Sequence, residues 1–362
     1  MLLFFFFSLF AACFLIGPVS AGSRLWELPI HQLRGNATAH AKRAVSVIPG
    51  TGAGDHRLWP DRTITYAFAD STANSRLKAM FFQGTEVWSR LKAYDFQYNL
   101  VSTSKCKSDR MNCLMVYYNT QGFLASTVAK PPATAADPSY EGPVMYLSDS
   151  FAVGNRNPII NIAHEIGHAW GLYHEHQNFR LWKTSDEQKQ ADTGWQDYTG
   201  DIFHSNKFHC ENLKDYATKL AEVMASPNSG INKDLMCSSQ ATASRFKFSA
   251  MEWLPTNLVG KKADSLYDPD SLMLYPSRAG GSGEASETTD NRQIILTYAD
   301  DSEIPTRQGP SDWDISRLVD LYGTATRAAS EPYNKKGGKM ENLFRNVRGQ
   351  STRAGDTEGG LC

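Results

Sequence analysis

Four of the nine histidines of this chain lie in one stretch, HEIGHAWGLYHEH, which runs from His164 to His176. On an α-helix, His164 and His168 would be one turn apart and would point the same way. Two imidazoles on one helix face can hold a single Zn²⁺ at about 2.0–2.1 Å each. Gly171 accepts a positive φ, so the chain can leave the helix there and return His174 to the same metal. The stretch therefore predicts a helix that ends at Gly171 and a metal site of three histidines.

Glu165 follows the first histidine and would be rotated away from the pair, where it can touch water at the metal rather than the metal itself. Zn²⁺ lowers the pKa of water to about 7, and a nearby carboxylate can then take the proton. His176 lies outside the ligand spacing, so we expect it at the surface or beside the site rather than on the metal. The alternative is a histidine-rich amphipathic helix with satisfied core histidines. The fixed offsets of Gly171 and His174 argue against that coincidence.

The longer segment HEIGHAWGLYHEHQ resembles the extended zinc motif of the metzincins, and Glu175 is most similar to the residue that follows the third histidine in the astacin family of secreted metalloendopeptidases. Metzincins also have a methionine turn beneath the zinc, and YDPDSLMLYPS would supply it with Met273. The resemblance implies that Tyr275 is a movable ligand near the zinc and a donor to the tetrahedral oxyanion. Without the resemblance, Met273 would be plain core and Tyr275 a buried aromatic residue.

The resemblance extends more weakly from Leu58 to Gly323, because LWPDRTITYAF and SDWDISRLVDLYG are similar to the first strand and the closing helix of astacins. It implies that GFLASTV, from Gly122 to Val128, is an upper edge strand that binds an extended substrate by β-augmentation.

Several features depart from the astacin pattern. Leu274 stands where astacins usually have a histidine, and a large insertion at about 177–258 separates His174 from the methionine turn. In astacins the equivalent of Glu175 meets the buried mature N-terminus, but the predicted arm at 44–59 is longer here.

The N-terminal segments predict secretion and processing. Residues 1–21 are apolar and end in small residues, which is typical of a signal peptide, although a signal anchor is the alternative. Residues 22–43 end in Lys42-Arg43 and are expected to be a propeptide. This segment has no aspartate or cysteine that could act as a latency switch, so Glu27, His31 and His40 are the candidates for such a role.

Beyond Cys13 the chain has five cysteines, and in an oxidising compartment Cys106–Cys113 and Cys210–Cys237 are the natural near-neighbour pairs. Cys362 is left as the odd one. The formal net charge is −1, so composition offers no electrostatic case for nucleic acid or an anionic membrane as a partner.

Periodicity predicts the remaining elements. Strand patterns cover 62–70, 95–101, 114–118, 122–128 and 143–148. Amphipathic helices are expected over 77–91, with Ser71, Thr72 or Asn74 as caps, over 158–171 and over 311–323. We expect an α+β fold of the metzincin-like zincin type: a mixed twisted sheet, an active-site helix, and a smaller, mostly irregular or helical C-terminal subdomain. The catalytic domain would span 44–323, and 324–362 would be a disordered polar tail.

The leading expectation is a secreted zinc endopeptidase that acts on peptide or protein substrates. His164, His168 and His174 would be ligands, with Glu165 as general base and Tyr275 as oxyanion donor. One alternative is a secreted zinc-binding protein of the same fold without turnover. Another is zinc-dependent hydrolysis of a non-peptide bond. The oligomeric state is not predicted.

Overall fold

The structure is a computed structural model that describes residues 45–50, 55–132, 140–190, 195–226, 233–256, 261–262 and 266–323. Residues Met1–Leu321 group as one unit, and only Tyr322 and Gly323 are described in the second unit, Tyr322–Cys362. The expected signal peptide, propeptide and polar tail lie outside the described residues.

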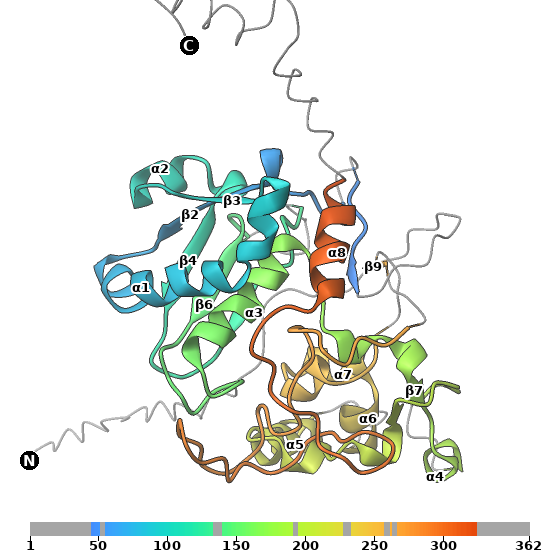
Figure 1. Cartoon of the computed structure of the whole chain (residues 1–362). Coiled ribbons are helices and arrows are strands. Elements are labelled where there is room, and N and C mark those ends of the chain that lie inside the picture. Colours follow the sequence, from blue (N-terminus) through green and yellow to red (C-terminus); the bar gives the residue numbers. More distant parts are fainter. Residues whose placement is uncertain are drawn as a thin grey trace, which may run out of the picture. The chain divides into compact units, whose positions relative to one another are not determined.

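A twisted five-stranded sheet forms the first half of the described chain (Figure 1). Its strands lie in the order β3 (Gln97–Leu100), β2 (Thr63–Phe68), β4 (Leu114–Tyr118), β6 (Val144–Leu147) and β5 (Ala125–Ser126). The first four are parallel, and β5 runs antiparallel to β6. Leu114, Met115 and Val116 are all buried, as expected for a central parallel strand that is covered on both faces. The expected α+β class with a mixed sheet is confirmed.

The edge strand is much shorter than the sequence predicts. The expectation covered Gly122–Val128, but only Ala125 and Ser126 pair with β6. Gly122 has φ +71° and Ala129 has φ +50°, so the backbone leaves the extended conformation on both sides of the pair. The position of β5 at the sheet edge agrees with the expectation.

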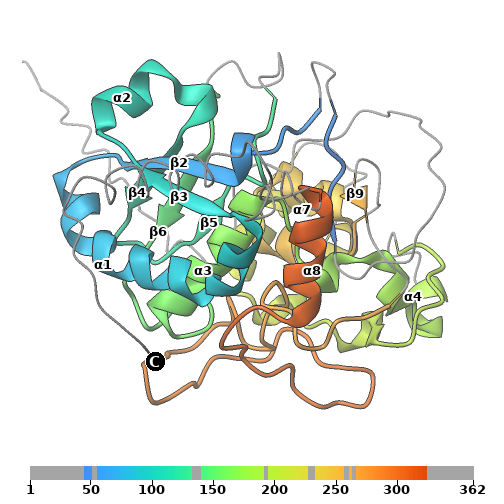
Figure 2. The ribbon, with the colours of Figure 1, turned by 45° about the horizontal axis from the view of Figure 1, so that its top comes forward.

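Two long helices, α1 (Ser71–Val87) and α3 (Pro158–Trp170), lie side by side on one face of the sheet, and α2 (Thr103–Ser108) lies on the other (Figure 2). The α1 cap is Asp70, whose side chain accepts a hydrogen bond from Ala73 N at 2.8 Å, and not one of the three residues expected from the sequence. The two long helices approach closely at Gly84, where a Cβ atom would lie 2.7 Å from Ile162 Cγ2.

Beyond Gly171 the described chain is mostly short helices and irregular segments, in agreement with the expected subdomain. Its helices are α4 (Asp186–Gln190), α5 (Tyr216–Met224), α6 (Lys233–Ser238), α7 (Gln240–Arg245) and α8 (Asp312–Leu321), and two-residue strands pair as β7 (Trp182–Lys183) with β8 (Phe203–His204). The 3₁₀ turns of the described chain are Pro60–Arg62, Ser89–Tyr94, Arg110–Asn112, Glu175–Gln177, Phe179–Leu181, Ser205–Lys207, Cys210–Asn212 and Ser249–Glu252. Trp182, Phe203, Phe248 and Trp253 belong to a second buried cluster, which the insertion shares with later residues such as Leu274 and Leu296.

Both expected disulfides are present. Cys106 is bonded to Cys113, and Cys210 is bonded to Cys237 within the insertion.

Helix α8 begins with a capping box. Ser311 Oγ accepts a hydrogen bond from Asp314 N at 2.9 Å, and the Asp314 carboxylate accepts one from Ser311 N at 3.1 Å.

The described N-terminal arm lies against the end of α3. Strand β1 (Ser46–Val47) pairs with β9 (Lys261–Lys262). Val47 N donates to Gly171 O at 2.9 Å, and Tyr173 N donates to Val45 O at 2.9 Å. The arm therefore supports the turn that connects α3 to His174.

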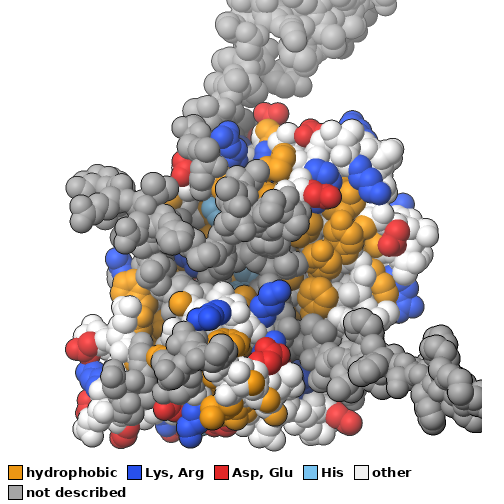
Figure 3. All heavy atoms as spheres, turned by 180° about the vertical axis from the view of Figure 1, so that it is seen from behind, with side chains coloured by type: hydrophobic (Ala, Val, Ile, Leu, Met, Phe, Trp, Pro, Cys, Tyr) orange, Lys and Arg blue, Asp and Glu red, His pale blue; other side chains and the backbone are white. Residues whose placement is uncertain are grey.

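Acidic and basic side chains of the described residues are interspersed on the face shown in Figure 3, which agrees with the near-zero net charge. None of the helices among the described residues is both long enough and apolar enough to cross a membrane.

Candidate metal centre

The helix that carries the first two histidines begins and ends as the sequence predicts. The Asn157 side chain accepts a hydrogen bond from Ile159 N at 3.0 Å, and Pro158 occupies the first turn, where its missing N–H costs nothing. Gly171 ends the helix with φ +114°, a conformation that other residues rarely adopt. The chain therefore turns sharply back toward α3.

This turn brings three histidines together. One ring nitrogen from each of His164, His168 and His174 lies within 4.8 Å of the other two. All three side chains are buried, with exposed fractions of 4% or less. The three-histidine cluster expected from the HExxHxxGxxH pattern is confirmed.

Each of these imidazoles has its Nδ1 engaged by an oxygen acceptor. The distances are 2.8 Å from His164 to Leu272 O, 2.7 Å from His168 to Leu172 O, and 3.1 Å from His174 to Gln177 Oε1. A carbonyl oxygen can only accept, so Nδ1 carries the proton in each neutral ring and Nε2 carries the lone pair. Hydrogen-bonded imidazoles of this kind are the usual arrangement around protein-bound zinc.

The Nε2 atoms converge on one point. His168 Nε2 and His174 Nε2 are 2.9 Å apart, and His164 Nε2 is buried with no hydrogen-bond partner among the described residues. Two lone pairs facing each other in a buried site repel, and a cation between them removes that repulsion. Burial lowers the pKa of His164 to about 4 and lowers the pKa values of His168 and His174 well below their ordinary value, so all three imidazoles are neutral at pH 7. The donor set therefore fits Zn²⁺, which takes three histidines at catalytic sites.

Glu165 lies beside this cluster. Its side chain is 1% exposed, and its Oε2 has no hydrogen-bond partner among the described residues. Burial raises the pKa of the Glu165 carboxyl well above its usual value. A buried carboxyl group whose pKa is raised binds a proton more readily than an ordinary glutamate, as a general base must.

The methionine turn lies beneath the histidines. Met273 is 1% exposed and packs against Gly167 of α3. Leu272, the residue before it, supplies the carbonyl that holds His164, and Met273 O accepts a hydrogen bond from Glu175 N at 3.1 Å. The structure thus joins both chain segments of the site through backbone hydrogen bonds.

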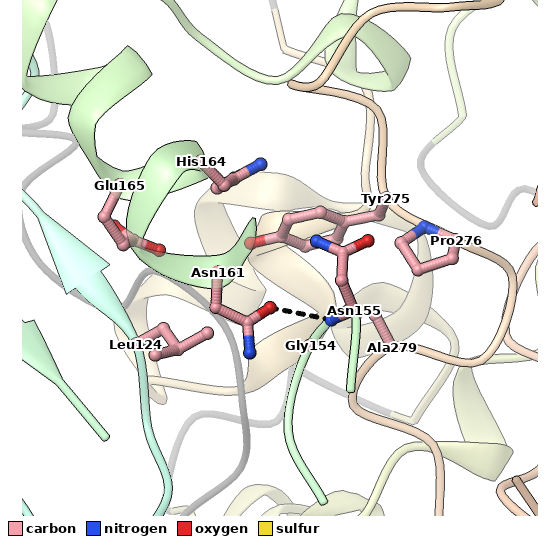
Figure 4. Close-up of a pocket in the computed structure, with 9 residues that line it drawn as sticks. All are labelled: Leu124, Gly154, Asn155, Asn161, His164, Glu165, Tyr275, Pro276 and Ala279. Atoms are coloured by element: carbon pink, nitrogen blue, oxygen red, sulfur yellow. Dashed lines mark hydrogen bonds between the residues drawn. The ribbon is translucent and has the colours of Figure 1, made fainter. Parts of the chain in front are cut away.

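Tyr275 is close to the same cluster. Its ring centroid lies 4.3 Å from that of His174 and 5.5 Å from that of His164. A pocket in front of α3 is lined by Leu124, Gly154, Asn155, Asn161, His164, Glu165, Tyr275, Pro276 and Ala279. Figure 4 shows the Tyr275 hydroxyl pointing toward the side of the pocket where Glu165 lies. All of the expected site residues are therefore in one place: three histidines together, with Glu165 and Tyr275 at the adjoining pocket.

His176 differs from one part of the expectation, because it is completely buried and not at the surface. Its Nε2 lies 2.8 Å from Glu252 O, a bond that commits this nitrogen to donating. Its ring lies 4.9 Å from that of Tyr275 and 5.2 Å from that of Trp253. His176 therefore lies beside the three-histidine cluster, between Tyr275 and residues of the insertion, which is the second of the two expected positions.

Two polar residues near His174 were not predicted from the sequence. Gln177 Oε1 accepts the His174 hydrogen bond, and a Glu252 carboxylate oxygen lies 3.8 Å from the same nitrogen. The signal for Gln177 was its position three residues after the third histidine in a tight turn. Glu252 gave no such signal, because it is far away in the sequence.

Glu175 is buried, and its Oε1 accepts a hydrogen bond from Asp268 N at 3.1 Å. Burial is the main cause that raises the pKa of this carboxyl to about 8. Residues 45–47 of the arm pair with β9 and with Gly171–Tyr173. The latter segment lies two to four residues before Glu175 in the sequence.

Comparisons with known proteins give a distant structural likeness. A scan of protein-family models finds no match, and no curated protein matches the sequence. One similar solved structure is high choriolytic enzyme 1, a hatching enzyme zinc-protease from the medaka fish Oryzias latipes, with 15% identity and a TM-score of 0.38 over 76% of this chain and 98% of that chain. Another is myroilysin, with 16% identity and a TM-score of 0.36 over 73% of this chain and 95% of that chain.

Proposed function

We propose that this chain is a secreted zinc-dependent endopeptidase. The observation that carries the proposal is the convergence of three neutral, Nδ1-anchored imidazoles beside a buried glutamate that has an unpartnered oxygen. A purely structural zinc site has four protein ligands and no need of an open side, whereas a three-histidine site next to a pocket leaves a position for water and substrate.

In this proposal, the Nε2 atoms of His164, His168 and His174 hold Zn²⁺. When bound, the ion would polarise a substrate carbonyl and lower the pKa of water. Glu165 takes a proton from the attacking water and returns it to the leaving amine, which its raised pKa favours. Tyr275, at the same pocket, donates its hydroxyl proton to the oxygen that becomes negatively charged.

A peptide substrate is supported by the place of the pocket beside the sheet edge. Leu124, which lines the pocket, directly precedes β5 (Ala125–Ser126), the edge strand. An extended peptide could add to that edge while its scissile carbonyl reaches Glu165. Ala125 and Ser126 are themselves buried, so the strand must be uncovered before a peptide can pair with it.

Secretion is supported by the apolar N-terminal stretch and by the two disulfides, which persist in oxidising compartments.

The test uses the full chain, expressed for secretion, with N-terminal sequencing of the product. Wild type, Glu165→Gln and the exposed control Glu222→Gln are analysed for zinc per chain and for cleavage of denatured casein, with and without a chelator. We expect one zinc in all three and cleavage by wild type and Glu222→Gln. The Glu165→Gln rate should fall by about 10²–10⁴. Zinc binding without any cleavage by processed wild type would favour the non-catalytic zinc-binding alternative. Cleavage of an ester but not of casein would favour a non-peptide hydrolase.

A further inference from the structure

The third histidine differs from the other two in what holds its Nδ1. His164 and His168 donate to backbone carbonyls, whose orientation is fixed by the fold. His174 donates instead to the side-chain amide of Gln177 at 3.1 Å. An amide can present either its oxygen or its NH₂ group, so something else must determine which end faces the imidazole.

Two carbonyls of the insertion determine the orientation of this amide. Gln177 Nε2 lies 2.8 Å from Met251 O and 3.4 Å from Leu254 O. Because both oxygens can only accept, the NH₂ group must face them, and Oε1 must face His174. His174 Nδ1 is then obliged to donate, and Nε2 is the nitrogen that carries the lone pair a metal would use. Gln177 is only 3% exposed, so water does not compete for these bonds.

The same turn of the insertion places a carboxyl group near His174. Glu252 lies in the 3₁₀ turn Ser249–Glu252, and its Oε2 is 3.8 Å from His174 Nδ1. This distance is too long for a hydrogen bond. At a buried position, however, the partial negative charge of this oxygen still favours an Nδ1–H that points toward it.

We propose that Gln177 is a positioning residue for the third zinc ligand, and that the turn Met251–Leu254 orients it. Through these contacts, the insertion orients one of the three histidines of the metal centre. This inference rests on the proposed zinc site, and it concerns how tightly the metal is held rather than the reaction.

The experiment compares zinc affinity in the full secreted chain for three substitutions. Gln177→Met removes the acceptor at similar volume. Gln177→Glu keeps an acceptor toward His174. Gln188→Met is the matched control, because Gln188 is also in the insertion and also uses its amide, donating to Ser205 O at 3.0 Å. Zinc dissociation constants come from competition with a chromophoric chelator, and Co²⁺ absorption spectra report the geometry of the ligands.

Loss of a group that orients a ligand typically weakens metal binding about 10–100-fold, so we expect this loss and an altered Co²⁺ spectrum for Gln177→Met. Gln177→Glu keeps the acceptor toward His174 but loses the NH₂ donor to Met251 O and Leu254 O, so we expect a smaller loss of affinity than for Gln177→Met. Gln188→Met should not change either readout. Affinity of Gln177→Met equal to wild type would overturn the inference, as would equal weakening by both Gln177 variants.

A measurement without substitution covers the case of a variant that does not fold. In the metal-free wild type, ¹⁵N NMR of His174 should show a protonated Nδ1 and an unprotonated Nε2 at pH 7; the opposite tautomer would refute the inference. Because metal binding is measured apart from cleavage, weakened zinc binding in a protein that cuts no peptide would support this inference while the proposed function failed.

Discussion

The sulfur of Met273 lies directly against Gly167 of α3, so close that a Cβ atom on Gly167 would be 2.5 Å from it and 3.1 Å from Trp88 Cζ2. Met273 and Trp88 are each 1% exposed, so neither can move into solvent to make room. The glycine between the first two histidines is therefore required by the packing of the methionine turn.

Gly167→Ala tests this packing. In a helix, alanine is normally more stable than glycine by about 0.5–1 kcal/mol. Overpacking a filled core costs about 1–3 kcal/mol and outweighs that gain, so we expect the variant to lose up to about 2.5 kcal/mol of its free energy of unfolding. Denaturant unfolding measures this loss. Gly309→Ala is the control, because a Cβ there meets only Val87 Cγ1 at 3.7 Å. A stabilised Gly167→Ala protein would show that the Met273 side chain can move away from the added methyl group at little cost.

Tyr275→Phe tests the assignment of its hydroxyl. The phenyl ring keeps the packing against His174, while the pocket loses one donor to the developing oxyanion. We expect kcat to fall by about 10²–10³ with little change in KM, since the lost interaction belongs to the transition state. Zinc per chain should be unchanged. The exposed Tyr94→Phe serves as control, and a Tyr275→Phe enzyme with wild-type kcat would remove this tyrosine from the mechanism.

Asp314 predicts an unusual dependence of stability on pH. Burial and the neighbouring Asp268 raise the pKa of this carboxyl to about 7, from an ordinary value of 3.8. Between these values the folded state holds a proton that the unfolded state has released, so the contribution of Asp314 is full below about pH 4 and is lost as the pH rises to 7. Relative to Asp314→Asn, the metal-free wild type should lose about 1.4 kcal/mol of unfolding free energy per pH unit in this window.

Unfolding of both proteins at pH 4.5, 5.5 and 6.5 gives the difference directly. A constant cost of the asparagine, which cannot accept all the bonds from Ser271, Leu272 and Ser311, does not affect the slope. A difference that is independent of pH would mean that Asp314 is ionised throughout.

Arg292 predicts a link between stability and substrate binding. Its guanidinium donates two hydrogen bonds to Asp290 at 2.8 Å each and one to Gly154 O at 3.0 Å, and Gly154 lines the pocket. Hydrogen bonds to charged groups are worth about 1.5–3 kcal/mol each, so Arg292→Met should destabilise the protein by at least about 2 kcal/mol. We also expect KM to rise as the pocket wall loosens.

The control for this prediction is Arg90→Met. Arg90 pairs with Asp312 on an exposed surface, where such pairs contribute about 0–1 kcal/mol. Equal losses from the two substitutions would show that the Arg292 network is an ordinary surface ion pair.

Local sequence signals predicted the part of the site that is local in the chain. Helix α3 has a capping asparagine, a proline in its first turn and a terminal glycine, so its bounds and the return of His174 follow from short-range chemistry. Strand β4 was predicted at its observed bounds because a buried parallel strand is a continuous apolar run. The two near-neighbour disulfides were predicted for the same reason of proximity.

Long-range contacts account for what was missed. The burial of His176 depends on Glu252 and Trp253, which lie far along the chain and approach it because the insertion packs into a core shared with residues 274–304. The length of β5 depends on backbone turns at Gly122 and Ala129, whose conformations alternating hydrophobicity does not reveal.

The Met251–Leu254 turn holds Gln177 through main-chain oxygens alone. Almost any side chain at those two positions would offer the same oxygens, provided that the backbone follows the same path. Mutational drift could therefore replace both residues while the coupling to the third histidine persisted. Comparison of related sequences would not reveal such a dependence, either by retained residues or by paired substitutions. A three-dimensional structure would be needed to find it.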